Sequence, residues 1–398
     1  MKKHVLLKGW VLVAIDILLI GAVLCGFCYF HHVREFWVID MTSDGEQTTE
    51  TTTLKVFTKP VKTTTTPSMG PGTDNEDPVI GTGTGDGTGT GSPDEPVTPP
   101  VILDQGDFGA SFPEKFLPEG ESIVTENSYI SHDINITYER KTIPSGKSQI
   151  VYYYYDIYIR NIENFYTAST KGGTRQYLDT IESYVPDMLD AEGNQMYDTL
   201  PVLSMNGDLY KYNDWPVAVR NGTPYCEGKP VYELAKYITA DIGVLYWDGS
   251  FEVISIADYD WEKVTQKGPY QIWHFGPGLL DGNGNTRGSS KDDYKYEGAS
   301  SNGIVGGGNP RAAIGYYEPG HYCFVVVDGR SAEYVNINIP RLAQIMSDLG
   351  CKQAYNLDGG NTAQVKFNGV YQRKSDPNAS QRKVDDILCI GEVAKRED

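Results

Sequence analysis

Short apolar runs rich in aromatic and β-branched residues predict that the folded part of this chain consists mainly of β-strands. The clearest run is 151–160, VYYYYDIYIR, in which almost every residue favours an extended backbone. Three further runs, at 242–247, 322–327 and 387–390, predict buried strands. No repeat of fixed period accompanies them, so the pattern indicates one large domain.

Two segments have apolar residues at helical spacing instead. The first covers 176–190, where Pro186 ends or kinks the helix. The second covers 340–349, which begins with a proline and is followed by Gly350 as a C-terminal cap. Strands interrupted by two helices predict an α+β fold, with a mixed, largely antiparallel β-sheet core and a few packed helices.

The N-terminal part of the chain has a different pattern, with an apolar run at 10–30 that is long enough to cross a bilayer as a helix. Three lysines precede it, so residues 1–9 are expected to stay in the cytoplasm. The run is too long for the apolar part of an ordinary signal peptide, and no small-residue cleavage motif follows it. We therefore expect a single-pass anchor in the cell membrane, with the C-terminal domain extracellular.

Residues 31–107 contain tracts of threonine, glycine and proline, such as GTGTGDGTGTGSPDEPVTPP. Such tracts cannot bury enough apolar surface to fold. They predict a disordered extracellular stalk that connects the anchor to a folded ectodomain at 108–398.

The overall composition narrows the class of partner. The 398 residues include 53 acids and 34 bases, which gives a formal net charge of −19 and argues against nucleic-acid binding. Tyrosine is abundant, with 28 residues, and it suits both half-buried strands and sugar-binding surfaces.

The six cysteines give no metal-binding knuckle outside the apolar run at 10–30. The four that lie beyond this run are widely separated in sequence, namely Cys226, Cys323, Cys351 and Cys389. The sequence allows disulfides among these four cysteines if the domain lies outside the cell, but their spacing does not show which cysteines would pair. We interpret most of them as buried thiols.

Five short stretches combine polar side chains with glycines next to strand-like segments. They are SMNGDLY, WHFGPGLL, NPRAAIGYYEPG, FVVVDGR and AYNLDGGNTAQV. Taken singly, each is explained by a turn or a packed side chain, because Asn-Gly and Asp-Gly are hairpin turn signals. Taken together, they place polar groups at strand ends, where a sheet can present them to one cleft.

These stretches, together with LAQIMSDLGCKQ and the closing VDDILCIG, occur in the order found in the phosphodiester glycosidase family, which this chain resembles over roughly 187–392. The likeness is greatest to membrane-anchored bacterial members described as exopolysaccharide biosynthesis proteins. It implies a hydrolase that cleaves the glycosidic bond of a sugar-1-phosphodiester in cell-wall or exopolysaccharide material. The expected partner is thus a carbohydrate phosphodiester or wall polymer.

The chain departs from the family pattern in two places. Asn361 stands where the family's LDGGGS or LDGGGT motif has a glycine, and Thr362 supplies the hydroxyl residue. An Asn-x-Pro stretch common in the family is replaced by 371–375, YQRKS. These departures motivate an alternative function, a non-catalytic ectodomain that binds glycans or wall polymers.

The resemblance implies a site that must hold phosphate charge. Guanidinium groups match phosphate oxygens, so Arg311 and Arg330 are the predicted phosphate ligands. The backbone of Gly359 and Gly360 is expected to add N–H donors, because glycine lets a ligand approach closely.

The reaction also needs a carboxylate that stabilises the oxocarbenium-like centre, activates water or attacks the sugar. Asp358, Asp328 and Asp208 are the candidates, and their spacing does not rank them, although we favour Asp358. Asn206 and Thr362 suit hydrogen bonds to the sugar or phosphate.

One histidine, His274, completes the predicted set of substrate-binding residues. It fits three roles: an acid, a group that orients another residue, or a packed side chain.

No cluster of histidines and acids has metal-ligand spacing, so a metal-dependent phosphodiesterase is the least favoured function and no cofactor is predicted. The stretch 281–285, DGNGN, begins like a calcium loop, but Thr286 stands where the loop needs glycine and Asp292 where it needs glutamate. A hairpin turn is the better interpretation. The sequence neither supports nor excludes a structural calcium site elsewhere in so acidic a domain.

Overall fold

The computed structural model describes the C-terminal part of the chain with some gaps. The described residues are 108–169, 178, 182, 197–208, 217–226, 241–294, 307–331, 333–373 and 382–395. The predicted tail, anchor and stalk at 1–107 lie outside these ranges, and so does most of the helix predicted at 176–190. Within the described residues, no helix is long and apolar enough to span a membrane.

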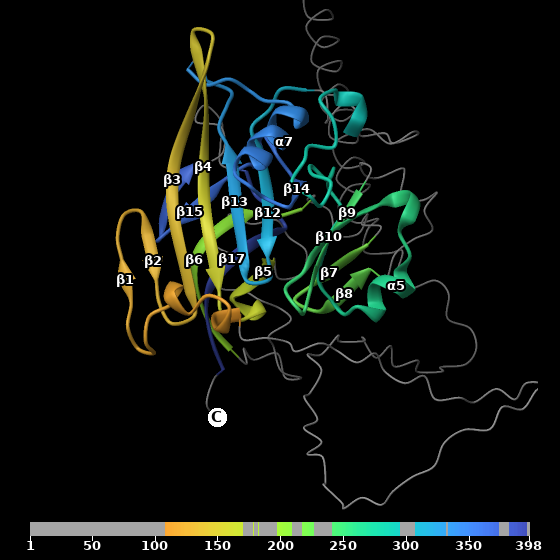
Figure 1. Ribbon diagram of the computed structural model, residues 1–398. Helices are drawn as coiled ribbons and strands as arrows, with labels where there is room; N and C mark the ends of the chain where they lie inside the picture. The colour runs from red at the N-terminus through yellow and green to blue at the C-terminus, as the bar shows by residue number, and fades with distance from the viewer. Residues whose placement is uncertain are drawn as a thin grey trace, which may run out of the picture. The chain divides into compact units, whose positions relative to one another are not determined.

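The largest sheet has seven strands in the order β1-β2-β3-β4-β13-β12-β14 (Figure 1). Their bounds are β1 (Ile123–Val124), β2 (Ser128–Ile130), β3 (Ile134–Ser145), β4 (Ser148–Ile159), β12 (Arg311–Glu318), β13 (His321–Val327) and β14 (Gln353–Leu357). The strands predicted at 151–160 and 322–327 are confirmed as β4 and β13, which pair with each other.

Two five-stranded sheets accompany it. One has the order β16-β15-β6-β17-β5, and the other has the order β10-β9-β11-β7-β8. The bounds in the first are β5 (Phe165–Ser169), β6 (Tyr197–Asn206), β15 (Val365–Phe367), β16 (Val370–Arg373) and β17 (Asp386–Lys395). In the second they are β7 (Ala218–Arg220), β8 (Thr223–Cys226), β9 (Asp241–Tyr246), β10 (Phe251–Ser255) and β11 (Pro269–Trp273). The strands predicted at 242–247 and 387–390 are confirmed within β9 and β17.

The strand pairings confirm the largely antiparallel core. Every described pairing between named strands is antiparallel. The parallel component expected of a mixed sheet is limited, in the described part of the chain, to an isolated bridge between Gln149 and Tyr334.

Helices are few among the described residues. The longest is α7 (Ile339–Asp348), which confirms the helix predicted at 340–349, and α5 (Trp261–Gln266) is shorter. The remaining turns of helix are η2 (Phe108–Ala110), η3 (Pro113–Lys115), η4 (Ile162–Asn164), η8 (Ile256–Asp258), η9 (Lys291–Tyr294) and η10 (Gly360–Thr362).

Strands β12, β13 and β14 of the seven-stranded sheet are largely buried on both faces, which explains their continuous apolar runs. Successive side chains of a strand point to opposite faces. In β13, Phe324 and Val326 join a core that includes Leu203 of β6, whereas Val325 joins a second core with Leu342 of α7. The sheet therefore lies between the β6 sheet on one side and α7 on the other (Figure 1).

The register of this sheet gathers polar residues at one edge. Arg311 opens β12 and pairs with Val327 at the end of β13, while Ala312 pairs with Leu357 at the end of β14. Since antiparallel strands alternate in direction, the start of β12 and the ends of its two neighbours share an edge. The residues that follow β13 and β14, which include Asp328 and Asp358, leave the sheet there.

The cap of α7 offers a direct test of the local structure. Asn338 Oδ1 accepts a hydrogen bond from the Arg341 N–H at 3.1 Å. Replacing a capping asparagine by alanine typically costs about 1 kcal/mol. Asn338→Ala is therefore expected to lower the free energy of unfolding by about that amount in a urea titration, because the N–H loses its acceptor. Asn338→Asp should keep the wild-type value, and equal losses in both variants would contradict the assigned cap.

Candidate active site

A pocket of about 340 Å³ lies at the edge where β13 and β14 end and β12 begins. Its lining residues are Phe275, Asn309, Arg311, Arg330, Asp358, Gly359, Gly360, Asn361, Thr362 and Arg382. The predicted residues Arg311, Arg330, Asp358, Gly359, Gly360 and Thr362 are thus brought together. The lining residues Phe275, Asn309 and Arg382 were not predicted as site residues.

Asp358 is the one carboxylate among the described lining residues, and it follows directly after β14. Its side chain is buried, and Oδ1 accepts a hydrogen bond from the Gly359 N–H at 2.8 Å. Burial raises the pKa of Asp358 to about 7, although the Thr362 hydroxyl and the Gly359 N–H oppose the rise. At neutral pH this carboxyl can therefore take up or release a proton, as acid–base catalysis requires.

Arg311 provides a buried positive charge in the same pocket, where it is only 1% exposed. Its guanidinium donates to two backbone oxygens, at 3.2 Å to Ile337 O and at 2.6 Å to Gly307 O. Burial lowers the pKa of Arg311 to about 10, while the negative charge of Asp358 opposes this change. The group therefore stays cationic at neutral pH.

Arg330 is an exposed arginine whose backbone N–H and guanidinium group are both held by hydrogen bonds. Its backbone has a positive φ of 58°, and its N–H donates to Asn336 Oδ1 at 3.0 Å. Its guanidinium donates to Asn309 Oδ1 at 3.0 Å and also to Asn361 Oδ1. Asn361, which departs from the family's glycine, therefore orients a cation of the pocket.

The two glycines of the LDGG stretch are required by close packing. A Cβ at Gly359 would lie 2.6 Å from Pro310 O, and a Cβ at Gly360 would lie 3.0 Å from a guanidinium nitrogen of Arg330. Gly360 also has a positive φ of 63°. Its N–H donates to Pro310 O at 2.9 Å, so that donor already has an acceptor in the chain. The glycines thus allow the loop to pack against the start of β12.

Asn206 lies beneath this loop. Its amide Nδ2 donates to Asp358 O at 2.7 Å, and its Oδ1 accepts from the Gln364 N–H at 3.1 Å. It is fully buried and is not among the residues that line the pocket. Asn206 was predicted as a sugar or phosphate ligand, and in this structure it fixes the main chain on both sides of the pocket loop instead.

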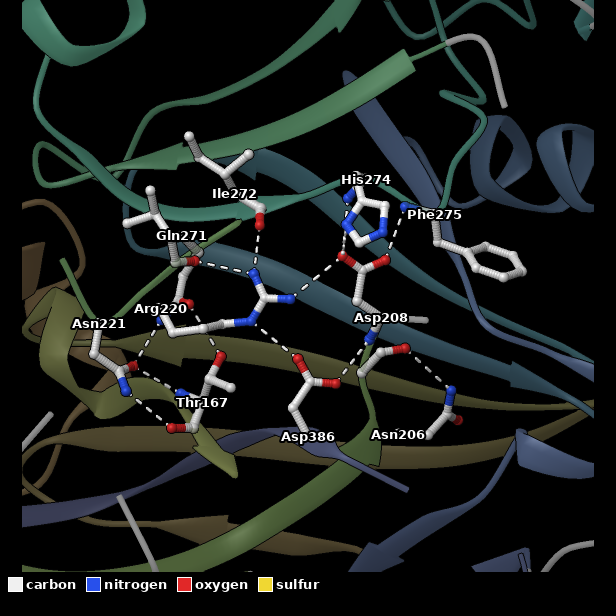
Figure 2. Close-up of polar contacts among 12 residues, drawn as sticks. Thr167, Asn206, Asp208, Arg220, Asn221, Gln271, Ile272, His274, Phe275 and Asp386 are labelled. Carbon is white, nitrogen blue, oxygen red and sulfur yellow. Dashed lines mark hydrogen bonds and ion pairs between the residues drawn. The ribbon is translucent and has the colours of Figure 1, made fainter. Parts of the chain in front are cut away.

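Asp208 and His274, both predicted site residues, meet in a buried polar network (Figure 2). Asp208 accepts hydrogen bonds from the N–H groups of His274, at 2.9 Å, and Phe275, at 2.8 Å. Its Oδ2 also lies 2.9 Å from His274 Nδ1. Burial favours a higher pKa for Asp208, but His274 and Arg220 outweigh it and lower the pKa to about 2. Asp208 is therefore ionised and holds Phe275 in the pocket wall.

Arg220 joins two buried carboxylates in the same network (Figure 2). Its Nε donates to Asp386 Oδ2 at 2.9 Å, and another nitrogen lies 3.3 Å from Asp208 Oδ2. Asp386 in turn accepts the Asp208 N–H at 3.1 Å. Neither Arg220 nor Asp386 was predicted as a site residue, although Asp386 belongs to the VDDILCIG stretch that carries part of the family resemblance.

Asp328, the third predicted catalytic carboxylate, is engaged elsewhere. Its Oδ1 accepts from Arg373 Nε at 3.0 Å, and its Oδ2 accepts from the Tyr153 hydroxyl at 3.2 Å. Arg373 also donates to Ala363 O, so the pair ties β16 to the chain just after the pocket loop. Asp328 is not among the lining residues. Its catalytic role stays a prediction, and its contacts are those of a structural ion pair.

The loop with Phe275 is anchored to the strand that delivers Asp358. Asn356 of β14 donates through Nδ2 to Gly276 O at 2.6 Å, and its backbone N–H donates to Pro277 O at 3.1 Å. The Gly276–Pro277 peptide bond is cis. One strand therefore positions both the carboxylate and the aromatic wall of the pocket.

The predicted hairpin turn at 281–285 is confirmed by an antiparallel bridge between Leu280 and Thr286. Asp281 Oδ1 accepts the N–H groups of Asn283 and Asn285, at 2.8 and 3.1 Å. The carboxylate is thus used within the turn. Across the described ranges, no three acidic, histidine or cysteine side chains gather into a metal-binding group.

Comparison with known proteins agrees with these motifs. The family model for phosphodiester glycosidases matches residues 206–391, which include every residue that lines the pocket. Residues 206–391, just under half of the chain, are therefore similar to a phosphodiester glycosidase domain. The resemblance expected from the sequence is thereby confirmed for this part of the chain.

Individual relatives of the domain are distant. The SPbeta prophage-derived uncharacterized protein YomE of Bacillus subtilis is 25% identical over 192 residues, a match that covers 48% of this chain and 28% of that protein. The chain therefore spans less than a third of the length of this relative.

Among solved structures, the catalytic domain of zebrafish N-acetylglucosamine-1-phosphodiester alpha-N-acetylglucosaminidase, auto-inhibited by its pro-peptide, is 16% identical with a TM-score of 0.48. That match covers 68% of this chain and 88% of the other. A hypothetical protein from Synechocystis is 12% identical with a TM-score of 0.44, and the match covers 67% and 63% of the two chains.

The buried ion pairs predict a large effect of one substitution. Arg220→Met would leave Asp208 and Asp386 without their cation in the interior, and breaking a buried pair costs roughly 3–5 kcal/mol. We expect a loss of that size in the free energy of unfolding, measured by urea titration. Arg341→Met, which changes a partly exposed arginine of α7, should alter it by less than about 0.5 kcal/mol. Similar values for both variants would contradict the structural importance of the network.

Proposed function

We propose that the domain hydrolyses a sugar-1-phosphodiester between the anomeric carbon and the phosphate oxygen. The products would be the free sugar and a phosphate monoester of the rest of the substrate. The observation that carries this proposal is the composition of the pocket, in which the buried carboxyl of Asp358 lies among three arginines. A substrate that fits such a pocket carries negative charge next to an electrophilic atom. Water that is activated by the carboxylate can attack that atom.

The arginines suit the phosphate. Arg311 offers a cation at a buried position, and Arg330 offers a guanidinium that is already oriented by two asparagine side chains. Charge-assisted hydrogen bonds from guanidinium groups to phosphate are stronger than neutral ones, and orientation in advance reduces the entropy lost on binding. Arg382 adds a third guanidinium to the lining. These groups would also stabilise the negative charge that grows on the departing phosphate.

Asp358 suits the role of general base. A phosphate monoester is a weakly basic leaving group, so it departs with little help from an acid. In the proposed step, the ionised Asp358 removes a proton from water, and the water oxygen bonds to the anomeric carbon. The electron pair of the broken carbon–oxygen bond stays on the phosphate oxygen.

The apolar wall of the pocket suits the sugar. The Phe275 ring lines the pocket, and an aromatic face can cover the apolar face of a sugar ring. Its position is fixed from two sides, by Asp208 through the Phe275 N–H and by Asn356 through the next residue. The Thr362 hydroxyl, which contacts Asp358, also lines the pocket, and its oxygen can accept a hydrogen bond from a sugar hydroxyl.

We also propose that the domain acts outside the cell on wall or exopolysaccharide material, tethered through residues 10–30. The support is the apolar run with lysines before it and the threonine-, glycine- and proline-rich tracts after it.

Removing the base should slow turnover strongly. Asp358→Asn keeps the size of the side chain but not its basicity, and we expect turnover to fall by roughly 10²–10⁴-fold, the range for a lost general base. The assay is a panel of sugar-1-phosphodiesters, with the released sugar and phosphate monoester both quantified. Asp281→Asn, in the exposed turn, is the matched control and should keep full activity. Wild-type turnover in Asp358→Asn would contradict the assignment, whereas binding of the panel without any hydrolysis would favour the glycan-binding alternative.

The pH profile tests the protonation state. Burial raises the pKa of Asp358 to about 7, so the ionised form dominates above that pH and the protonated form below it. If Asp358 is the base, kcat/KM should rise as the pH increases through about 7, because this ratio reports the free enzyme. A ratio that falls over the same range would show that the protonated carboxyl is the active form.

The asparagine that orients Arg330 should act through substrate binding. Asn361→Ala removes one acceptor of the guanidinium, and hydrogen bonds to charged groups contribute about 1.5–3 kcal/mol. We expect KM to rise about tenfold or more and kcat to change far less. Asn283→Ala, in the exposed turn, is the control. An unchanged KM, or an equal fall in kcat, would contradict this role.

A further inference from the structure

Two cysteines that are distant in sequence lie in contact in the interior, away from the pocket. Cys323 belongs to β13, and Cys351 lies two residues before β14. Both are fully buried, and their Sγ atoms are 3.5 Å apart. Neither residue lines the pocket, and the proposed reaction does not use either one.

A glycine on the strand between them makes the space for both sulfurs. Gly315 of β12 pairs with Cys323 on one side and with Ala354 of β14 on the other. A Cβ at Gly315 would lie 2.5 Å from each Sγ, which is too close for any side chain. It would also lie 2.8 Å from the terminal methyl of Met346, so α7 covers the sulfurs from the other side. The two thiols therefore share one closed space.

We propose that Cys323 and Cys351 are a modification site, which forms a disulfide when the chain folds in an oxidising compartment. The bond length of a disulfide is about 2.05 Å, so the sulfurs need to approach by roughly 1.5 Å. Because β12 lies between the two cysteines, their side chains meet over Gly315, and closing the gap needs both side chains to turn toward each other and the segment with Cys351 to shift toward β13. Among the described residues, Cys389 does not compete for either sulfur. Its own Sγ lies 3.8 Å from the Ser204 hydroxyl.

The oxidant is a small-molecule or protein disulfide. One cysteine thiolate attacks a sulfur of that disulfide, which forms a mixed disulfide and releases one thiol. The second cysteine thiolate then attacks the mixed disulfide, which forms the Cys323–Cys351 bond and releases the second thiol. The oxidant gains two electrons and two protons, and the pair of cysteines loses them.

The exchange belongs to folding rather than to the folded protein. Burial and the neighbouring Cys351 raise the pKa of Cys323, and only the thiolate is a good nucleophile. Both sulfurs are also inaccessible once α7 is packed over them. Oxidation therefore has to precede that packing, and the finished bond would be protected from external reductants.

The position of the bond predicts its effect. It would join β13 to the start of β14 and close the chain segment that contains α7, which restricts the unfolded chain and so stabilises the fold. Since neither cysteine reaches the pocket, activity should not depend on it. Disulfides persist mainly outside the cytoplasm, so the bond also bears on where the domain matures, independently of its proposed reaction.

The test uses the full chain, refolded with a mixture of reduced and oxidised glutathione and then blocked with a thiol-alkylating reagent under denaturing conditions. Digestion without reductant should yield a peptide pair joined through Cys323 and Cys351, with Cys389 alkylated. Recovery of both residues as alkylated thiols, or joined to other partners, would overturn the proposal.

Thermal unfolding gives the second readout. The chain is denatured, reduced and then refolded either with the glutathione mixture or without oxidant. The protein refolded without oxidant should melt several degrees lower, both for the wild type and for the control Cys389→Ala. A double variant, Cys323→Ala with Cys351→Ala, should unfold at one temperature under both conditions. A wild-type melting temperature that is independent of the redox treatment would also contradict the bond, and this comparison needs no variant to fold.

Discussion

The burial of one guanidinium between two carboxylates is the constraint on which the site depends. Arg220 ends β7 of one sheet, whereas Asp208 lies two residues after β6 and Asp386 begins β17 of another sheet. Three charges removed from water are tolerated only if each satisfies the others. The requirement fixes the two sheets against each other at this point. Directly beside it, Asn206 extends the connection to the main chain of Asp358 at the edge of the third sheet.

This arrangement gives two buried carboxyls opposite properties. Asp208 is surrounded by donors and cations, which lower its pKa to about 2, so it serves as a fixed negative charge. Asp358 has a buried environment with fewer compensating donors, and its pKa rises to about 7. When two carboxyl groups have environments that give them very different pKa values, the difference commonly distinguishes a structural carboxylate from a carboxyl that exchanges protons in catalysis. The chemistry therefore concentrates on Asp358, and the network keeps it in place.

The sequence predicts the elements better than it predicts the contacts. Strand and helix positions follow from apolar patterns, and Asp358 and Arg311 were predicted from motifs at strand ends together with the family resemblance that these motifs carry. Arg220 was missed because it has no distinctive neighbours in sequence and acquires its partners only through the register of two sheets. Asp208 was predicted as a candidate base, because a motif does not reveal whether a carboxylate faces a pocket or a buried arginine. Those distinctions depend on long-range packing.

The position of bond cleavage is the most direct test of the proposed chemistry. Hydrolysis of a sugar-1-phosphodiester can be run in water enriched in the heavy oxygen isotope, with both products analysed by mass spectrometry. If Asp358 directs water to the anomeric carbon, the label appears in the hydroxyl of the released sugar and is absent from the phosphate monoester. Label in the phosphate would show that the phosphorus–oxygen bond breaks, which would contradict a glycosidase mechanism at this pocket.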